Sequence, residues 1–261
     1  MQLPQWLDNL IYEQLGAKYC RCNSDMTVID WDKKDVLNYL GTYFPRSYAE
    51  AYCIFGEYFK SQFKMYGDKE ALTIFDFGCG TGGEIIGLLN AISENLPNIK
   101  EVNLVAMDGN YHALRLFERV LTDYSKRVSL NIKSKIIPLT IDDFYDLTIL
   151  DRVLEEKFDV FMSFKAICEF VSKDNFEKRN AYTHIVKTFI PKLSTDGIML
   201  LVDVSSYNNV SQEWLPKMMD AGVEQAGCNL LKRNDGYNQT FKVSHQKKQG
   251  DISKIVWRIL K

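Results

Sequence analysis

The sequence of 261 residues lacks the long apolar segments and the cationic start that mark membrane and secreted proteins. No apolar run approaches the roughly 18 residues that a membrane-spanning helix needs. The first residues, MQLPQWLDNLIYEQLG, contain no basic segment followed by an apolar one, so they do not have the pattern of a signal peptide. We therefore expect a cytoplasmic protein with no membrane partner.

Histidine and closely spaced cysteine are also scarce. Only three histidines are present, and among the six cysteines only Cys20 and Cys22 lie near each other. The sequence has no C-x-x-C pair and no cysteine and histidine cluster with the spacing of a tetrahedral zinc site. We expect no bound metal, and we expect the cysteines to be free thiols in a reducing compartment.

A large excess of positive or negative charge is lacking as well. The formal net charge is -2, so the chain has no overall positive field of the kind that non-specific nucleic-acid binding uses. Hydrophobic residues make up 46% of the sequence and charged residues 25%, which is typical of a globular protein. This composition neither supports nor excludes a nucleic-acid partner, and it does not indicate an oligomeric state.

The first 68 residues have a helical pattern. Apolar residues recur at helical spacing from Leu3 to Leu15. Farther on, Ser47 and Glu50 have the spacing of a capping box, which predicts that a new helix begins there, and Gly67 is a predicted helix end. We expect residues 1–68 to form a helical lid or elaboration and residues 69–261 to form the main domain.

From residue 71 onward, short apolar runs alternate with amphipathic segments. This alternation predicts an α/β fold with parallel strands, right-handed crossovers and helices on both faces of the sheet. The predicted strands are 71–77, 102–108, 132–138, 158–164 and 197–204, and the predicted helices are 82–94, 110–123, 174–191 and 210–224. Only QKKQG separates the last two apolar runs, so we expect 237–245 and 251–260 to pair as an antiparallel hairpin at one edge of the sheet.

The segment LTIFDFGCGTGGEIIGLLNAI, at 72–92, passes from an apolar strand through four glycines into a helical pattern. Absent side chains let a ligand touch the backbone, and the N-terminus of the following helix favours anionic groups. We therefore expect a ligand to be held closely by Gly78, Gly80, Gly82 and Gly83.

Two classes of ligand compete for this loop. Gly78, Gly80 and Gly83 satisfy the G-x-G-x-x-G fingerprint of dinucleotide-binding proteins, which is a weak signal alone. Asp76, two residues before the first glycine, would repel a pyrophosphate but can attract the ammonium group of an amino acid. The acid favours a ligand with an aminoacyl end.

Further acidic residues follow the next two predicted strands. Asp108 ends the second strand, where a carboxylate can accept hydrogen bonds from both hydroxyls of a ribose. After the third strand, Asp143 could accept from the amine of adenine while Phe144 packs against the ring, and Asp142 could fill the same role as Asp143.

Together, the segments IFDFGCGTGG, VAMDGNYHAL, IDDFYDL and FDVFMSFKAICEF resemble the class I S-adenosylmethionine-dependent methyltransferases in order and spacing. The resemblance covers about residues 70–261. It implies a Rossmann-like, seven-stranded sheet that the C-terminal hairpin completes, and it implies S-adenosyl-L-methionine as the cofactor.

The resemblance also implies roles for individual residues. Gly78, Gly80 and Gly82 would flank the methionine portion of the cofactor, Asp108 would accept the ribose hydroxyls, and Asp143 with Phe144 would hold adenine. Ser163 and Phe164 would lie beside the reactive sulfonium. Cys79 and Gly109, which adjoin these residues in the chain, are included in the predicted cofactor site.

A second, shorter resemblance concerns FPRSYAEAYCIFGEYF, directly before the glycine strand. This segment is similar to the one found there in the mitochondrial-ribosome-associated branch of the superfamily. The cluster-binding cysteines of that branch have no counterpart in this sequence, so we do not extend the resemblance to a ribosomal substrate.

Candidate catalytic residues are fewer. The segment after the fourth strand lacks the N/D-P-P-Y/F arrangement that acts on planar amino groups. Lys165 and Glu169 could orient or deprotonate a methyl acceptor, although solvated loop residues are an equally simple interpretation. Tyr48, with Arg46, could belong to a lid over the cofactor or could simply pack within an aromatic-rich helix.

These features predict an S-adenosylmethionine-dependent methyltransferase that moves the sulfonium methyl group by in-line displacement. Such a reaction needs alignment and exclusion of water more than acid-base groups. We expect a small-molecule acceptor. The alternatives are an RNA methyltransferase, suggested by the basic last 30 residues, a non-catalytic cofactor-binding assembly factor, and a nicotinamide-dependent oxidoreductase.

Overall fold

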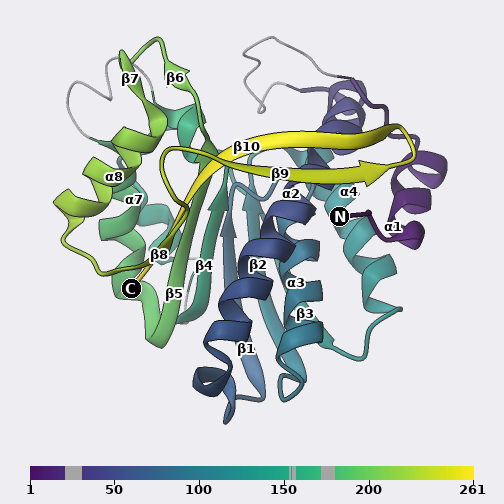
Figure 1. The fold of residues 1–261 in the computed structure, drawn as a ribbon, viewed down its shortest axis with the longest axis horizontal. Coiled ribbons are helices and arrows are strands. Elements are labelled where there is room, and N and C mark those ends of the chain that lie inside the picture. Colours follow the sequence, from purple (N-terminus) through teal and green to yellow (C-terminus); the bar gives the residue numbers. More distant parts are fainter. Residues whose placement is uncertain (21–30, 153, 155–156, 172–179) are drawn as a thin grey trace. The chain divides into compact units, whose positions relative to one another are not determined.

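The computed structural model describes residues 1–20, 31–152, 154, 157–171 and 180–261 (Figure 1). By its contacts the chain divides into two compact units. The first unit comprises Met1–Leu72, Cys79–Thr140 and Phe241–Ser253, and the second comprises Thr73–Gly78, Ile141–Thr240 and Lys254–Lys261. None of the helices in the described part of the chain has both the length and the apolarity needed to span a bilayer.

The fold is α/β, as the sequence predicts, with a mostly parallel sheet and helices on both sides. The strand order is β3-β2-β1-β4-β5-β10-β8, and β9 pairs with β10. These strands are β1 (Ala71–Phe77), β2 (Glu101–Asp108), β3 (Asn131–Pro138), β4 (Phe158–Phe164), β5 (Leu193–Val204), β8 (Leu230–Arg233), β9 (Gln239–His245) and β10 (Lys248–Leu260).

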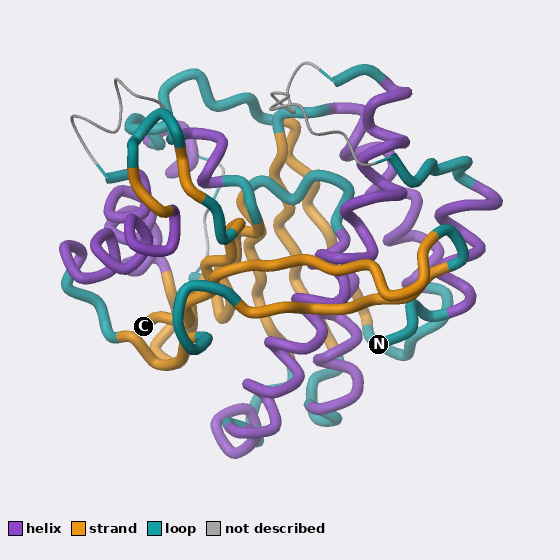
Figure 2. Tube along the Cα trace, turned by 45° about the horizontal axis from the view of Figure 1, so that its top comes forward, coloured by secondary structure: helices purple, strands orange, loops and turns teal. Residues whose placement is uncertain are grey.

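The predicted pairing of the last two strands is confirmed, because β9 pairs with β10, but this hairpin does not form the edge of the sheet. The second half of β10 pairs antiparallel with β5 on one side and with β8 on the other, so β8 lies at the edge and the sheet has eight strands rather than seven. The first half of β10 runs beside β9 as a two-stranded ribbon (Figure 2). The N-terminal segment pairs with this ribbon through a bridge between Gln2 and Ser244.

Helices of the first unit are α1 (Gln5–Asn9), η1 (Leu10–Gln14), α2 (Lys33–Ser61), η3 (Phe63–Tyr66), α3 (Gly83–Asn95) and α4 (Tyr111–Ser125). The prediction that a helix begins at Ser47 is wrong, because α2 runs unbroken through Pro45. Proline has no N–H to donate to the carbonyl four residues earlier, which is that of Gly41. The hydroxyl of Tyr12 donates to this carbonyl instead, so the helix continues without an unpaired buried acceptor.

The second unit contains α5 (Thr148–Asp151), η4 (Ile167–Phe170), α7 (Ala181–Phe189), η5 (Ile190–Lys192) and α8 (Leu215–Ala226). Part of the helix predicted at 174–191 lies outside the described residues, and α7 is its described portion. The helix predicted from 210 begins at Leu215, because a small hairpin of β6 (Tyr207–Asn208) and β7 (Glu213–Trp214) precedes it. The core of this unit includes a group of phenylalanine rings, namely Phe75, Phe77, Phe158, Phe161 and Phe189.

Candidate functional site

The glycine loop follows β1 and leads into α3. Its backbone has positive φ angles at Gly78, Gly80 and Gly82, of 78°, 48° and 77°. At Gly82 a side chain is excluded by packing as well as by conformation, because a Cβ built there would lie 2.1 Å from Cδ2 of Phe117 in α4. The loop conformation that the sequence predicts is therefore one that only glycine adopts without strain.

Asp108, at the end of β2, is hydrogen-bonded to this loop. Its Oδ2 accepts the backbone N–H of Gly80 at 2.8 Å, and its Oδ1 accepts the backbone N–H of Asn110 at 2.7 Å. Burial raises the pKa of the Asp108 carboxyl, while these two hydrogen bonds act in the opposite direction. Each oxygen keeps a second lone pair, and the side chain remains partly exposed, so it can still accept hydroxyl groups of a ligand.

The residues next to Gly80 and Asp108 have structural contacts of their own. The N–H of Cys79 donates to the carbonyl of Met107 at 2.9 Å, and the side chain of Cys79 is buried. This bond joins the loop to the end of β2 a second time. Gly109, by contrast, is half-buried. Within the first unit the structure thus brings together Cys79, Gly80, Gly82, Asp108 and Gly109.

A row of aromatic residues beside the loop was missed in the sequence analysis. Tyr39 of α2 lies against Gly80, because a Cβ built on Gly80 would be 3.4 Å from Cε1 of Tyr39. The ring of Tyr39 contacts those of Trp31 and Tyr43, each with a centroid distance of 4.9 Å. The spacing of Tyr39 and Tyr43, which places both on one helix face, is the feature of the sequence that could have predicted this row.

The two residues considered for a lid have other contacts. Tyr48 is 1% exposed and lies where α2 packs on α3; its hydroxyl accepts a hydrogen bond from Asn90 at 2.6 Å. Gly87 permits this close packing, since a Cβ there would be 2.4 Å from the carbonyl oxygen of Tyr48. Arg46 forms an ion pair with Asp251 of β10. The structure therefore gives Tyr48 a packing position rather than an exposed one.

In the second unit, the ends of β1 and β4 are joined by a buried hydroxyl. The Oγ of Ser163 donates to the carbonyl of Phe77 at 3.0 Å, and both Ser163 and Phe164 are buried. Asp76 is also fully buried. Gly78 lies against Ala166, because a Cβ built on Gly78 would be only 2.4 Å from that of Ala166.

The two residues predicted to bind adenine differ in their exposure to solvent. Asp143 and its alternative Asp142 are exposed, and Asp143 accepts the N–H of Tyr145 at 2.8 Å in a local turn. Phe144 is 3% exposed, with its ring stacked on Phe170 at 4.6 Å. An adenine contact by Asp143 and Phe144 stays a prediction.

The loop after β4 is held by an acid that the sequence analysis did not assign to the site. Asp203, fully buried at the end of β5, accepts the N–H of Cys168 at 3.1 Å and the hydroxyl of Tyr182 at 2.9 Å. Burial raises the pKa of Asp203, and its hydrogen bonds act against that rise. The position of Asp203 at the carboxyl end of an apolar strand was the signal that could have found it.

The candidate catalytic residues lie in this anchored loop. Lys165 has a positive φ of 57°, which is uncommon for a residue with a side chain, and its N–H donates to the carbonyl of Val202 at 2.8 Å. Glu169 is exposed. Within the second unit the structure thus brings together the ends of β1, β4 and β5 with the loop that carries Lys165 and Glu169.

No family model matches the chain, and no curated protein matches it. Solved structures with a similar fold include a precorrin-6y C5,15-methyltransferase from Geobacter metallireducens, with 11% identity, a TM-score of 0.44 and coverage of 77% of this chain and 86% of that chain.

Two others are a protein from Pyrococcus horikoshii described as an RNA methyltransferase and one from Listeria monocytogenes described as a class I S-adenosylmethionine-dependent methyltransferase. The first has 12% identity, a TM-score of 0.48 and coverage of 99% of this chain and 98% of that chain. The second has 12% identity, a TM-score of 0.48 and coverage of 90% of this chain and 62% of that chain. The names of the Geobacter and Pyrococcus proteins state different methyl acceptors, a precorrin and RNA.

Proposed function

We propose that the chain is an S-adenosylmethionine-dependent methyltransferase. The observation that carries the proposal is the hydrogen bond from the N–H of Gly80 to the carboxylate of Asp108. It joins a loop that only glycine adopts without strain to an acid at the carboxyl end of a parallel strand, which is where open α/β sheets bind nucleosides.

The residues around the glycine loop fit such a cofactor. Asp108 has lone pairs to spare for two ribose hydroxyls, and the bare backbone at Gly80 allows a ligand to approach closely. The buried carboxylate of Asp76 favours an aminoacyl ammonium group over a pyrophosphate, so it supports this cofactor against a nicotinamide dinucleotide. Cofactor contacts by Gly78, Asp143, Phe144, Ser163 and Phe164 stay part of the proposal.

When bound, the cofactor supplies a methyl group made electrophilic by the sulfonium. The task of the protein is then to hold the acceptor in line with that methyl group and to exclude water. Lys165 and Glu169 are the candidates for orienting the acceptor. The backbone around them is fixed by Val202 and Asp203, which limits the positions that their side chains can take.

We favour a small-molecule acceptor over RNA. Two of the cations in the basic last 30 residues are engaged within the protein. Arg258 is 1% exposed and pairs with Asp220, and Lys261 pairs with Asp196. These pairings reduce the positive charge that this segment could offer to a phosphate backbone.

Action in the cytoplasm remains a prediction from the sequence.

Calorimetry with S-adenosylhomocysteine and with reduced nicotinamide dinucleotide tests the proposal directly. Binding of the first compound and not of the second is expected. Incubation with methyl-labelled S-adenosylmethionine and fractionated extract then identifies the acceptor class, by the entry of label into small molecules, RNA or protein. Binding without transfer to any fraction would instead support a non-catalytic assembly factor, and no binding of the cofactor would end the proposal.

A further inference from the structure

One face of α2 connects the glycine loop to the ribbon of β9 and β10. Tyr39, Tyr43 and Arg46 follow one another at helical spacing, so they lie on the same face. Tyr39 lies against Gly80, the ring of Tyr43 stacks on that of Tyr39, and the guanidinium of Arg46 lies over the Tyr43 ring at 5.4 Å from its centroid. The contacts form a continuous row.

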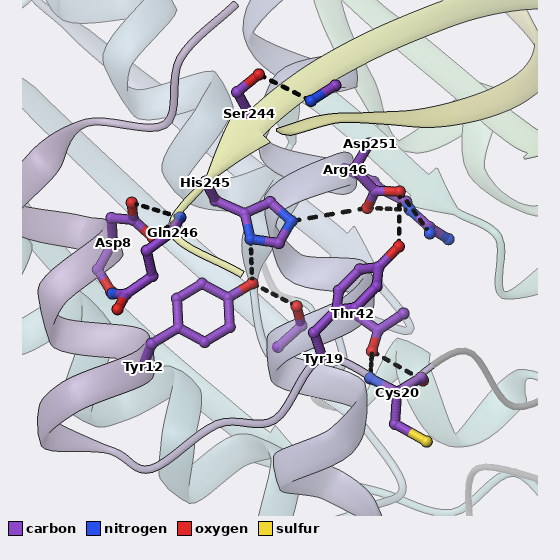
Figure 3. A network of polar contacts seen from close by, with 12 residues as sticks. Asp8, Tyr12, Tyr19, Cys20, Thr42, Arg46, Ser244, His245, Gln246 and Asp251 are labelled. Atoms are coloured by element: carbon purple, nitrogen blue, oxygen red, sulfur yellow. Dashed lines mark hydrogen bonds and ion pairs between the residues drawn. The ribbon is translucent and has the colours of Figure 1, made fainter. Parts of the chain in front are cut away.

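The far end of the row is held by a buried carboxylate. Arg46 donates to both oxygens of Asp251, from Nε at 2.8 Å and from an Nη at 2.9 Å (Figure 3). The side chain of Arg46 is 11% exposed and that of Asp251 is fully buried. A bidentate pair of this kind fixes the plane of the guanidinium as well as its position.

Asp251 is itself positioned by further contacts. Tyr19 donates its hydroxyl to Oδ1 of Asp251 at 3.0 Å (Figure 3). His245 lies with Nε2 3.8 Å from Oδ2 of Asp251, and its Nδ1 is 2.8 Å from the hydroxyl of Tyr12. The carboxylate is therefore held from the N-terminal segment and from β9, and it presents a fixed acceptor pair to Arg46.

We propose that Asp251 is a positioning residue for the glycine loop, acting through Arg46 and Tyr43 on Tyr39. Tyr39 then supports the loop at Gly80, where φ is 48° and the N–H points to Asp108. The inference rests on the proposed function, because it assumes that the cofactor binds at this loop. It adds that the strength of binding depends on a carboxylate in a hairpin remote in sequence.

The test compares two acidic residues of the same network. Asp8 is buried and accepts the N–H of Gln246 (Figure 3). The hydrogen bonds of its side chain among the described residues go to Gln246 and not to the row on α2. Asp251→Asn and Asp8→Asn should both lower the melting temperature. Only Asp251→Asn should weaken binding of S-adenosylhomocysteine, by about tenfold in Kd, as for coupled neighbouring residues. Equal Kd values for Asp251→Asn and the unchanged protein would overturn the inference.

A second pair of variants covers the case in which Asp251→Asn does not fold. Tyr43→Phe keeps the ring and should leave Kd unchanged, whereas Tyr43→Ala breaks the row and should raise Kd by about tenfold. A Tyr43→Ala protein that binds as tightly as the unchanged one would refute the inference. Absence of binding by the unchanged protein would instead refute the proposed function, so the two failures are distinguishable.

Discussion

Asp108 and Gly80 are joined by a hydrogen bond, in which the carboxylate at the end of β2 accepts the backbone N–H of the loop at 2.8 Å. The acid has two tasks in the proposed function. It fixes the loop before any ligand binds, and it offers its remaining lone pairs to the ligand. Loss of the carboxylate should therefore affect affinity twice, once by loosening the loop and once by removing the acceptor.

Replacement of this acid is the first prediction. Asp108→Ala should weaken binding of S-adenosylhomocysteine by about 1–3 kcal/mol, because hydrogen bonds to a charged group are lost. Calorimetry measures the change. Asp123→Asn, which removes the same charge from an ion pair with Lys126 at the end of α4, should bind normally. Normal affinity in Asp108→Ala would show that the ribose contact is misassigned.

The second prediction compares two costs of replacing a glycine, that of a positive φ angle and that of steric overlap with a neighbouring side chain. Gly227→Ala, where φ is 70° and no atom of the described residues lies within 4 Å of the new Cβ, should cost about 1–2 kcal/mol of unfolding free energy. Gly82→Ala adds the overlap with Phe117 and should cost about 3 kcal/mol or more. Urea unfolding gives both values. Equal losses would mean that Phe117 does not fill the space beside Gly82.

The third prediction concerns the thiol beside Asp203. Burial, followed by the negative charge of Asp203, raises the pKa of Cys168 well above its usual value. Less thiolate is then present at a given pH, and alkylation should be slow. With iodoacetamide at about pH 8, the exposed Cys20 should react at least about tenfold faster than Cys168, as followed by peptide mass spectrometry. Similar rates would contradict the raised pKa of the Cys168 thiol.

The fourth prediction is an alkaline effect on stability. The hydrogen bond to Glu94, followed by burial, raises the pKa of Tyr52 to about 12 from 10.0. The folded state keeps this proton where the unfolded state loses it, so the stabilisation is complete below pH 10.0 and is lost as the pH rises through about 12. Tyr52→Phe should show a smaller fall in unfolding free energy across that range. Parallel curves for the two proteins would contradict the assignment.

Local patterns account for the parts of the fold that the sequence predicts well. The bounds of β1 and β4 agree with the prediction because each is a short apolar run ended by glycine or by a polar turn. The glycine loop and Asp108 are likewise read from adjacent residues. Contacts between distant residues account for the errors. Nothing in the neighbourhood of Pro45 shows that Tyr12 satisfies the carbonyl of Gly41.

Distant partners also explain what was missed at the site. The four residues of β8 are too few to stand out, and they form a strand only because β10 pairs with them. The stacking of Phe144 on Phe170 depends on a residue far along the chain, so the sequence around Phe144 does not show it. Asp203 is surrounded by donors from Cys168 and Tyr182, which the linear order does not place beside it.

The Phe241–Ser253 stretch belongs to the same compact unit as the N-terminal helices. A shortened protein starting near residue 69 would leave Asp251 and His245 without Arg46 and Tyr12, exposing a carboxylate and an imidazole among apolar neighbours. Replacing the N-terminal helices with those of another protein would therefore require a matching change in the hairpin of β9 and β10. Arg46 and Asp251, 205 positions apart, are expected to be conserved together among related sequences.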